Sequence, residues 1–424
     1  MKYNTKKLSS GLRIIHMPSV SPVVYCGYQL AVGSRDEGVG EEGLAHFTEH
    51  MTFKGTDRRN AIQIINALER LGGDLNAYTN KESTVFYAAV QKEHLRVAVD
   101  LLTDVVFHST YPQTEIDREV EVVCDEIESY NDSPAELIYD EFEDLLFEGH
   151  PLGHNILGQA ERLRSYTTVD FRRFADRYYL PQNAVFFVYG DVNFQRLCNT
   201  LESLLPESAA RSLPKEEIAA TSNDNVGAGQ YGSIAEEPTG GTPQTVERTR
   251  GTHQAHLIIG TRAYGADHPR RLTLFLLNNI LGGPAMNARL NLSLRERNGL
   301  VYTVESSMVA YGDVGVWSVY FGCDPHDVSR CRRLVRHELD KLMEKPLSPT
   351  ALSAAKQQLK GQLAIACDSR EQFALDFGKI YLFEGKERHI DELFRRIDAI
   401  TADDLRQVAC ELFPAGRLTT LIYK

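Results

Sequence analysis

The chain has 424 residues, of which 42% are apolar and 25% are charged, as in ordinary soluble globular proteins. Its formal net charge of −12 argues against nucleic acid or an anionic membrane surface as the main partner. No stretch approaches the roughly 20 apolar residues of a membrane helix, and the N-terminus lacks a signal-peptide apolar run. Seven scattered cysteines without a CxxC pair favour reduced core thiols in a cytoplasmic protein, or a periplasmic one if a signal peptide was removed.

The first motif in chain order is "GLAHFTEHMTFKGT", residues 43–56, which follows a glycine-rich loop and contains helix-forming residues. On a helix, His46 and His50 lie one turn apart on one face, and Glu49 lies beside that face. Two neutral imidazoles on one face can bind Zn²⁺, and the acid can act as general base on a metal-activated water. This H-x-x-E-H order is the inverse of H-E-x-x-H and is the inverzincin signature. The alternative is a polar helix face without a ligand.

A zinc site needs a third protein ligand, and the acidic segment "EIDREVEVVCDEIESYNDSP", residues 115–134, offers candidates. The spacing of Glu119 and Glu126, seven residues apart, puts them on one helix face. Glu126 can complete a His₂Glu site, and Glu119 can orient a ligand. Spacing alone does not choose among five acids or exclude a solvated acidic face. These acids are Glu119, Glu121, Asp125, Glu126 and Glu128.

The composition changes over residues 209–244, where Gly, Ser, Pro, Asn and Glu dominate and apolar residues show no helical or strand periodicity. This composition predicts a linker or a long surface excursion. We therefore expect one domain over 1–208, which contains the candidate zinc residues, and a second over 245–424.

The two halves share an order of elements. Residues 83–106 and 313–339 each predict a strand, a polar turn and an amphipathic helix. Residues 166–192 and 399–424 each predict a helix that starts with Thr and Asp, then a Pro turn and a terminal strand. We infer a duplicated α+β unit, with chance resemblance of common patterns as the alternative.

The sequence resembles the pitrilysin/insulinase family of zinc peptidases, and is closest to its short-chain branch of mitochondrial-processing-peptidase-like and bacterial proteins. "GLAHFTEHMTFKGT" resembles the zinc helix, "LERLGGDLNAYTNKESTVFY" the turn and substrate-binding strand, and "REVEVVCDEI" the helix with the distal glutamate. The resemblance covers nearly the whole chain except the linker. It implies Glu126 as the third zinc ligand and Glu119 as its support.

Two further pairs of residues follow from the resemblance. "LRERNGLVYTVESS" is similar to the segment whose Arg and Tyr face the zinc site, here Arg295 and Tyr302, which would stabilise an oxyanion. The alternative is a surface arginine and a tyrosine in a strand core. Asn76 and Ala77 match the edge strand that aligns an extended substrate, and the alternative for Asn76 is a turn.

The resemblance implies two homologous domains, each a mostly antiparallel sheet packed with helices, that form half of a clamshell chamber. A homodimer would complete the chamber, with the active site shared between subunits. The expected function is zinc-dependent endopeptidase activity on peptides or unstructured segments. The alternatives are a non-catalytic scaffold or assembly subunit of the same fold, and a zinc hydrolase that acts on something other than peptides.

Overall fold

The computed structural model describes residues 2–205 and 243–424, so the predicted linker lies, except for its last two residues, outside the described residues. The described chain forms two compact units, each built from three segments. Unit 1 consists of 2–128, 154–205 and 366–389, and unit 2 consists of 129–153, 243–365 and 390–424. The contiguous domain boundaries expected from the sequence stay a prediction. Within the described ranges no helix is both long and apolar enough to span a membrane.

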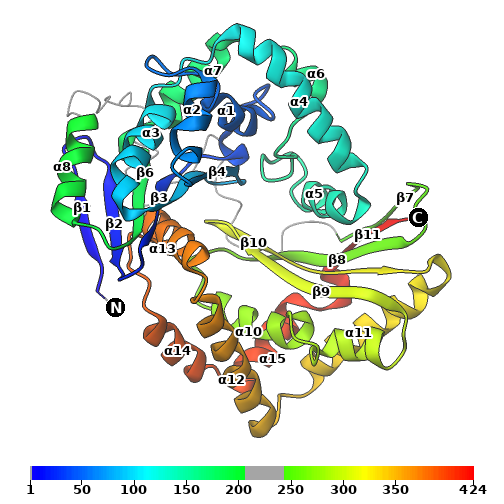
Figure 1. The fold of residues 1–424 in the computed structure, drawn as a ribbon. Coiled ribbons are helices and arrows are strands. Elements are labelled where there is room, and N and C mark those ends of the chain that lie inside the picture. The colour runs from blue at the N-terminus through cyan, green and yellow to red at the C-terminus, as the bar shows by residue number, and fades with distance from the viewer. Residues whose placement is uncertain (1, 206–242) are drawn as a thin grey trace. The chain divides into compact units, whose positions relative to one another are not determined.

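Unit 1 is built on a six-stranded mixed sheet (Figure 1). The strand order is β1 (Asn4–Lys7), β2 (Arg13–Pro18), β6 (Ala184–Gly190), β3 (Val23–Leu30), β5 (Thr84–Gln91) and β4 (Asp74–Thr79). Neighbouring strands are antiparallel, apart from the parallel pair β2 and β6. β4 is an edge strand and leaves one row of backbone N–H and C=O groups without a sheet partner.

Helices cover both faces of this sheet. The helices of unit 1 that come from the first half of the chain are α1 (Leu44–Thr52), α2 (Ala61–Glu69), α3 (Leu95–Phe107), α4 (Gln113–Asn131), α6 (Ala160–Leu163), α7 (Thr168–Tyr178) and α8 (Phe194–Leu204). Of these, α1 and α3 pack with Tyr28 and Phe86 in the main core of the unit. On the other face, Phe373 and Phe377 of α13 (Arg370–Glu384) pack against Phe187 of β6.

Unit 2 contains a five-stranded sheet with the same topology as five strands of unit 1. Its order is β7 (Thr245–Arg248), β11 (Thr419–Tyr423), β8 (Ala255–Tyr264), β10 (Val314–Cys323) and β9 (Val301–Ala310). In the order across the sheet, these strands correspond one by one to β2, β6, β3, β5 and β4, and the parallel pair β7 and β11 corresponds to β2 and β6. The predicted duplicated α+β unit is therefore confirmed.

The second sheet is also covered on both faces. The helices of unit 2 that come from the second half of the chain are α10 (Arg271–Gly282), α11 (Val328–Glu344), α12 (Pro349–Ala366), α14 (Ile390–Ala399) and α15 (Ala402–Leu412). On the other face, Ile138 and Phe142 of α5 (Pro134–Leu146) pack against Val316 and Leu421. Every residue of β10 is buried, because a strand covered on both faces cannot alternate between apolar and polar side chains.

The repeated helix starts seen in the sequence are capping boxes. The carboxylate of Asp170 accepts from the backbone N–H of Thr167 at 2.9 Å, and Asp404 accepts from the N–H of Thr401 at 2.8 Å. Each helix, α7 or α15, is followed by a short turn of 3-10 helix and then by the strand β6 or β11. All seven cysteines are unpaired and five of them are buried, in line with the expected core thiols.

Candidate metal centre

Helix α1 begins at a buried carboxylate that is supplied from outside the helix. Gly43, the residue before the helix, has a left-handed backbone (φ 84°) and offers no side chain as a cap. Glu37 takes this role: its Oε1 accepts from Ala45 N at 2.7 Å, and its Oε2 accepts from Gly43 N at 3.1 Å. His154 Nε2 lies 2.8 Å from the same Oε2 and holds it in place. A carboxylate here also interacts favourably with the helix dipole.

The packing of α1 explains why its polar residues are buried. Leu44, Phe47 and Met51 enter the core of unit 1 and fix the rotation of the helix. This rotation leaves His46 and Glu49 each only 8% exposed, at the surface of the core. The ring centroids of His46 and His50 are 4.7 Å apart, as expected for residues one helical turn apart.

Helix α4 brings Glu126 to both histidines. His46 Nε2 lies 3.8 Å from Glu126 Oε1, and His50 Nε2 lies 3.5 Å from Glu126 Oε2. One ligand atom from each residue lies within 4.8 Å of the other two, and within the described ranges this is the one such group of histidine, cysteine or acidic residues. Donor atoms on one tetrahedral zinc ion lie roughly 3.4 Å apart, so these three residues fit the metal after small side-chain adjustments.

The structure shows which acids of α4 contact the two histidines, a choice that sequence spacing left open. Glu119 Oε1 lies 3.1 Å from His50 Nδ1, on the side of the ring away from Glu126. Because a carboxylate only accepts, Nδ1 carries the proton and Nε2 is left as the metal-facing atom. Glu121 instead pairs with Arg164 at 2.9 Å. Glu119 and Glu126 therefore share a helix face, as their spacing predicts.

The protonation state of His46 suits metal binding. Burial, and then the neighbouring His50, lower the pKa of His46 to about 3, so this ring is neutral at pH 7. Burial alone would lower the pKa of His50, but Glu119 and the nearby carboxylates raise it above its usual value. Neutral imidazole is the form that coordinates a metal, so His46 needs no deprotonation at neutral pH.

Glu49 has the properties of a general base. Burial raises its pKa to about 7, although a hydrogen bond from Thr79 and the nearby His50 oppose this shift. Thr79 Oγ1 donates to Glu49 Oε2 at 2.6 Å, so β4 fixes the position of the carboxylate. A carboxyl group with a pKa near neutral can both accept and return a proton at pH 7.

The residues predicted to bind substrate lie in the edge strand. Asn76 and Ala77 belong to β4, where Asn76 pairs with Tyr87 and Ala77 pairs with Phe86 of β5. The alternative reading of Asn76 as a turn residue is wrong. The side chain of Asn76 is exposed.

Arg295 and Tyr302 lie together in unit 2. Arg295 belongs to the π-helical turn η5 (Asn291–Glu296), and its guanidinium lies 5.7 Å from the ring centroid of Tyr302 in β9. Tyr302 is 82% exposed, so the alternative reading as a strand core residue is wrong. The part of these two residues in the site stays a prediction.

Sequence reasoning missed the residues that support the site. Lys54, whose Nζ lies 2.5 Å from Glu119 Oε2, is four residues after His50, a spacing that could have drawn attention to it. Glu37 lies in the acidic loop just before α1, where a capping acid is common. His154 and Thr79 reach the site only through contacts distant in sequence, for which the sequence carries no local signal.

Comparison with known proteins gives a consistent result. The family profile described as "Insulinase (Peptidase family M16)" matches residues 14–160, and that described as "Peptidase M16 inactive domain" matches residues 165–359. An uncharacterized zinc protease of Bacillus subtilis is 32% identical over 418 residues, which cover 97% of this chain and 96% of the relative. One of Streptomyces coelicolor is 32% identical over 416 residues, which cover 98% of this chain and 87% of the relative.

Solved structures share the fold. A protease from Helicobacter pylori matches with a TM-score of 0.89 and 22% identity, over 100% of this chain and 99% of that one. A protein from Pseudomonas fluorescens described as a peptidase M16 inactive domain matches with a TM-score of 0.88 and 18% identity, over 100% and 98% of the two chains. The predicted two-domain α+β class is confirmed.

Proposed function

Because this chain belongs to peptidase family M16, we propose that it is a zinc-dependent endopeptidase that hydrolyses peptides or unstructured polypeptide segments. His46, His50 and Glu126 would hold the zinc ion, and Glu49 would be the general base. The observation that carries this proposal is the convergence of three ligand atoms within 4.8 Å of one another beside Glu49. The zinc protease names of full-length relatives support it.

The proposed chemistry divides between the metal and the protein. Zinc, when bound, supplies a Lewis acid that lowers the pKa of water and polarises a carbonyl group. Glu49 accepts the proton of the attacking water and returns it to the leaving amine, which its pKa of about 7 permits. Thr79 holds the carboxylate in place through both transfers. Glu119 keeps the proton of His50 on Nδ1.

The edge strand β4 is the proposed site for the substrate backbone. An extended peptide can add to a free sheet edge through main-chain hydrogen bonds, with Asn76 and Ala77 in contact with it. Thr79 belongs to the same strand and contacts Glu49, so a peptide aligned on β4 lies next to the base. This mode of binding requires an extended chain, which explains the proposed preference for unstructured segments.

Arg295 and Tyr302 are proposed to stabilise the oxyanion that forms on the substrate carbonyl. A guanidinium and a phenol both donate hydrogen bonds. Tyr302, beside Arg295, is exposed on unit 2, so a substrate can reach it. We further propose that two chains form a homodimer around a closed chamber. In this arrangement, the Arg295 and Tyr302 pair of one subunit serves the zinc site of the other.

The test is cleavage of a mixed peptide library by the purified chain, with and without a chelator, together with metal analysis. The proposal predicts bound zinc and cleavage that a chelator abolishes and added zinc restores. A chain that binds zinc but cleaves no peptide would favour the non-catalytic scaffold. Zinc-dependent hydrolysis of esters without peptide cleavage would favour another class of hydrolase.

A further inference from the structure

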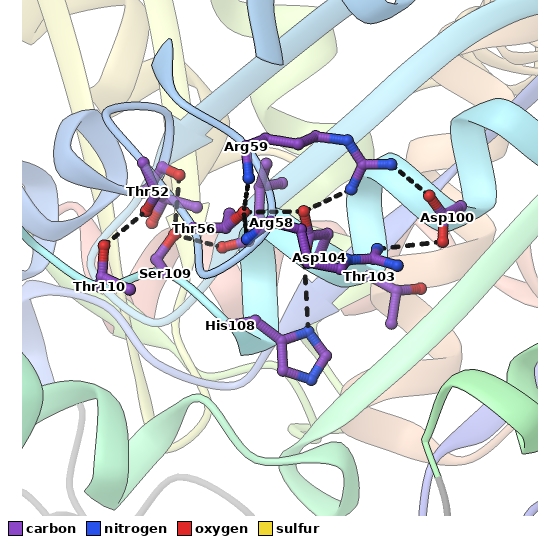
Figure 2. Close-up of polar contacts among 12 residues, drawn as sticks. Thr52, Thr56, Arg58, Arg59, Asp100, Thr103, Asp104, His108, Ser109 and Thr110 are labelled. Atoms are coloured by element: carbon purple, nitrogen blue, oxygen red, sulfur yellow. Dashed lines mark hydrogen bonds and ion pairs between the residues drawn. The ribbon is translucent and has the colours of Figure 1, made fainter. Parts of the chain in front are cut away.

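The segment that follows α1 is held by a buried carboxylate of α3 (Figure 2). Asp104, whose side chain is fully buried, accepts from Arg58 Nε at 3.0 Å and also from Arg59. Asp100, one turn earlier on α3, accepts from Arg58 Nη2 at 3.1 Å and also from Arg59. We call these four residues the ionic clamp. Two arginines that share two acids hold a loop more rigidly than one exposed ion pair does.

Further hydrogen bonds add to the ionic clamp. Thr56 Oγ1 donates to Asp104 at 2.9 Å, and it also accepts from the backbone N of Arg59 at 2.9 Å. Ser109 Oγ, just beyond α3, donates to the carbonyl of Thr52 at 2.8 Å, and Thr110 N donates to the carbonyl of Gly55 at 3.0 Å (Figure 2). The segment 52–60 is therefore fixed at both ends against α3.

Lys54 extends from this fixed segment to the metal site. Its Nζ lies 2.5 Å from Glu119 Oε2, while the other oxygen of the same carboxylate lies 3.1 Å from His50 Nδ1. The side chains of Lys54 and Glu119 are 27% and 12% exposed, so this pair is partly withdrawn from water. Glu119 thus has one oxygen for Lys54 and one for His50, and the cation fixes the rotation of the carboxylate.

The two histidines differ in whether a hydrogen bond at Nδ1 orients the ring. His46 Nδ1 is buried and has no hydrogen-bond partner within the described ranges, so no bond at this nitrogen orients the ring. The ring of His50 is oriented by Glu119. The geometry at the metal therefore depends on how firmly Glu119 is held.

We propose that Lys54, held by the ionic clamp, is a positioning residue that fixes Glu119 and thereby aims His50 Nε2 at the metal. This inference rests on the proposed metal site. It predicts that loss of the cation weakens metal binding. A purely electrostatic role predicts the reverse, because a cation beside the site repels a divalent metal ion. The sign of the change in affinity therefore distinguishes positioning from electrostatics.

The test is zinc affinity of the metal-free full chain, measured by competition with a chromophoric chelator. Lys54→Met should weaken zinc binding about 10- to 100-fold, the usual effect of losing an outer partner of a ligand. Lys54→Arg, which keeps the cation, should recover most of the affinity. Arg58→Ala, which loosens the ionic clamp without touching Lys54, should weaken binding by a smaller factor of the same sign. The matched control is Lys92→Met, which removes an exposed lysine paired with Asp191 at 2.7 Å.

A spectroscopic readout separates positioning from a loss of folding. With Co²⁺ in place of zinc, the visible absorption of Lys54→Met should change in shape, because the His50 ligand is no longer held, whereas Lys92→Met should match the wild type. Zinc binding by Lys54→Met that is unchanged or tighter would overturn the inference while leaving the metal site intact. Failure of the wild type itself to bind zinc would overturn the proposed site and this inference with it.

Discussion

Thr79 Oγ1 donates a hydrogen bond of 2.6 Å to Glu49 Oε2, and this contact joins the edge strand β4 to the acid of the metal helix. Burial raises the pKa of Glu49 to about 7, and the bond from Thr79 opposes that shift because it favours the ionised form. One threonine therefore holds the proposed base in position and lowers its proton affinity.

Replacing Thr79 should move the pH dependence of cleavage. In Thr79→Val, Glu49 loses a bond that favours the carboxylate, so its pKa rises and the acidic limb of the kcat/KM profile shifts up by up to about one pH unit. Thr79→Ser keeps the hydroxyl and should retain the wild-type profile. If Thr79→Val leaves the acidic limb in place, Glu49 is not the group whose titration the limb reports.

Replacing Glu49 should abolish turnover without loss of the metal. Glu49→Gln keeps the shape of the side chain but cannot accept a proton, so peptide cleavage should fall by at least about 10²- to 10⁴-fold. Zinc content should stay at the wild-type level, because Glu49 is not among the three converging ligands. Near-normal cleavage by this variant would show that another group is the base.

The same substitution should stabilise the metal-free protein in alkaline solution. The pKa of Glu49 is raised from 4.5 to about 7 in the folded state, so its contribution to stability is fully present below pH 4.5 and is lost as the pH rises through 7. Metal-free Glu49→Gln should therefore exceed the wild type by about 1 to 3 kcal/mol at pH 8 and by little at pH 4.5. Urea unfolding at the two pH values measures this difference.

Glu119→Gln is the matched control, and its expected effect on stability at pH 8 has the opposite sign to that of Glu49→Gln. Burial alone would raise the pKa of Glu119, but bonds with His50 and Lys54 bring it below its usual value. Its carboxylate therefore contributes stability above the unfolded pKa, and this contribution is lost as the pH falls through the folded value. Metal-free Glu119→Gln should be less stable than the wild type at pH 8. Equal effects of the two substitutions would contradict the different environments assigned to them.

The start of α1 should depend on Glu37. Glu37→Gln keeps an acceptor for Ala45 N but puts an amide NH₂ where Glu37 Oε2 accepts from Gly43 N, so one backbone N–H at the helix start loses its partner, which should cost about 1 to 2 kcal/mol of stability. Glu41→Gln, in the same loop, is the control. Zinc affinity should fall in Glu37→Gln, since His46 lies in the first turn of this helix. A wild-type stability and affinity in this variant would show that Glu37 does not support the helix.

A shared active site makes a prediction about mixed dimers. A chain with Glu49→Gln and a chain with Tyr302→Phe should each be impaired alone. If each site takes Glu49 from one subunit and Tyr302 from the other, mixed dimers contain one intact site and recover up to about half of the wild-type activity per dimer. Isolated mixed dimers that show no recovery would contradict the shared site.

The local chemistry of the site could be predicted from the sequence, but its long-range partners could not. His46, Glu49 and His50 lie within five positions, and helical periodicity alone puts them beside one face. Glu126 required the family resemblance, because five acids on one helix offer similar spacing. Thr79, His154 and Asp104 act through contacts that are 30 to 117 residues distant in sequence, and no local pattern encodes such pairs.

The fold shows the same division. The capping residues Thr167 and Thr401 and the strands after them could be read from local patterns. By contrast, α5 packs on the sheet of unit 2 and α13 on the sheet of unit 1, each with strands mainly from the other half of the chain. An amphipathic helix shows that one of its faces is buried, but not which sheet buries it.

The most direct test of the central claim is the zinc content of purified wild type, Glu126→Gln and Glu121→Gln, measured per chain after removal of loosely bound metal. Both glutamates lie on α4, but Glu126 faces the histidines and Glu121 pairs with Arg164. The account predicts about one zinc ion per chain in the wild type and in Glu121→Gln, and a large loss in Glu126→Gln. Zinc retained in full by Glu126→Gln, or missing from the wild type, would contradict it.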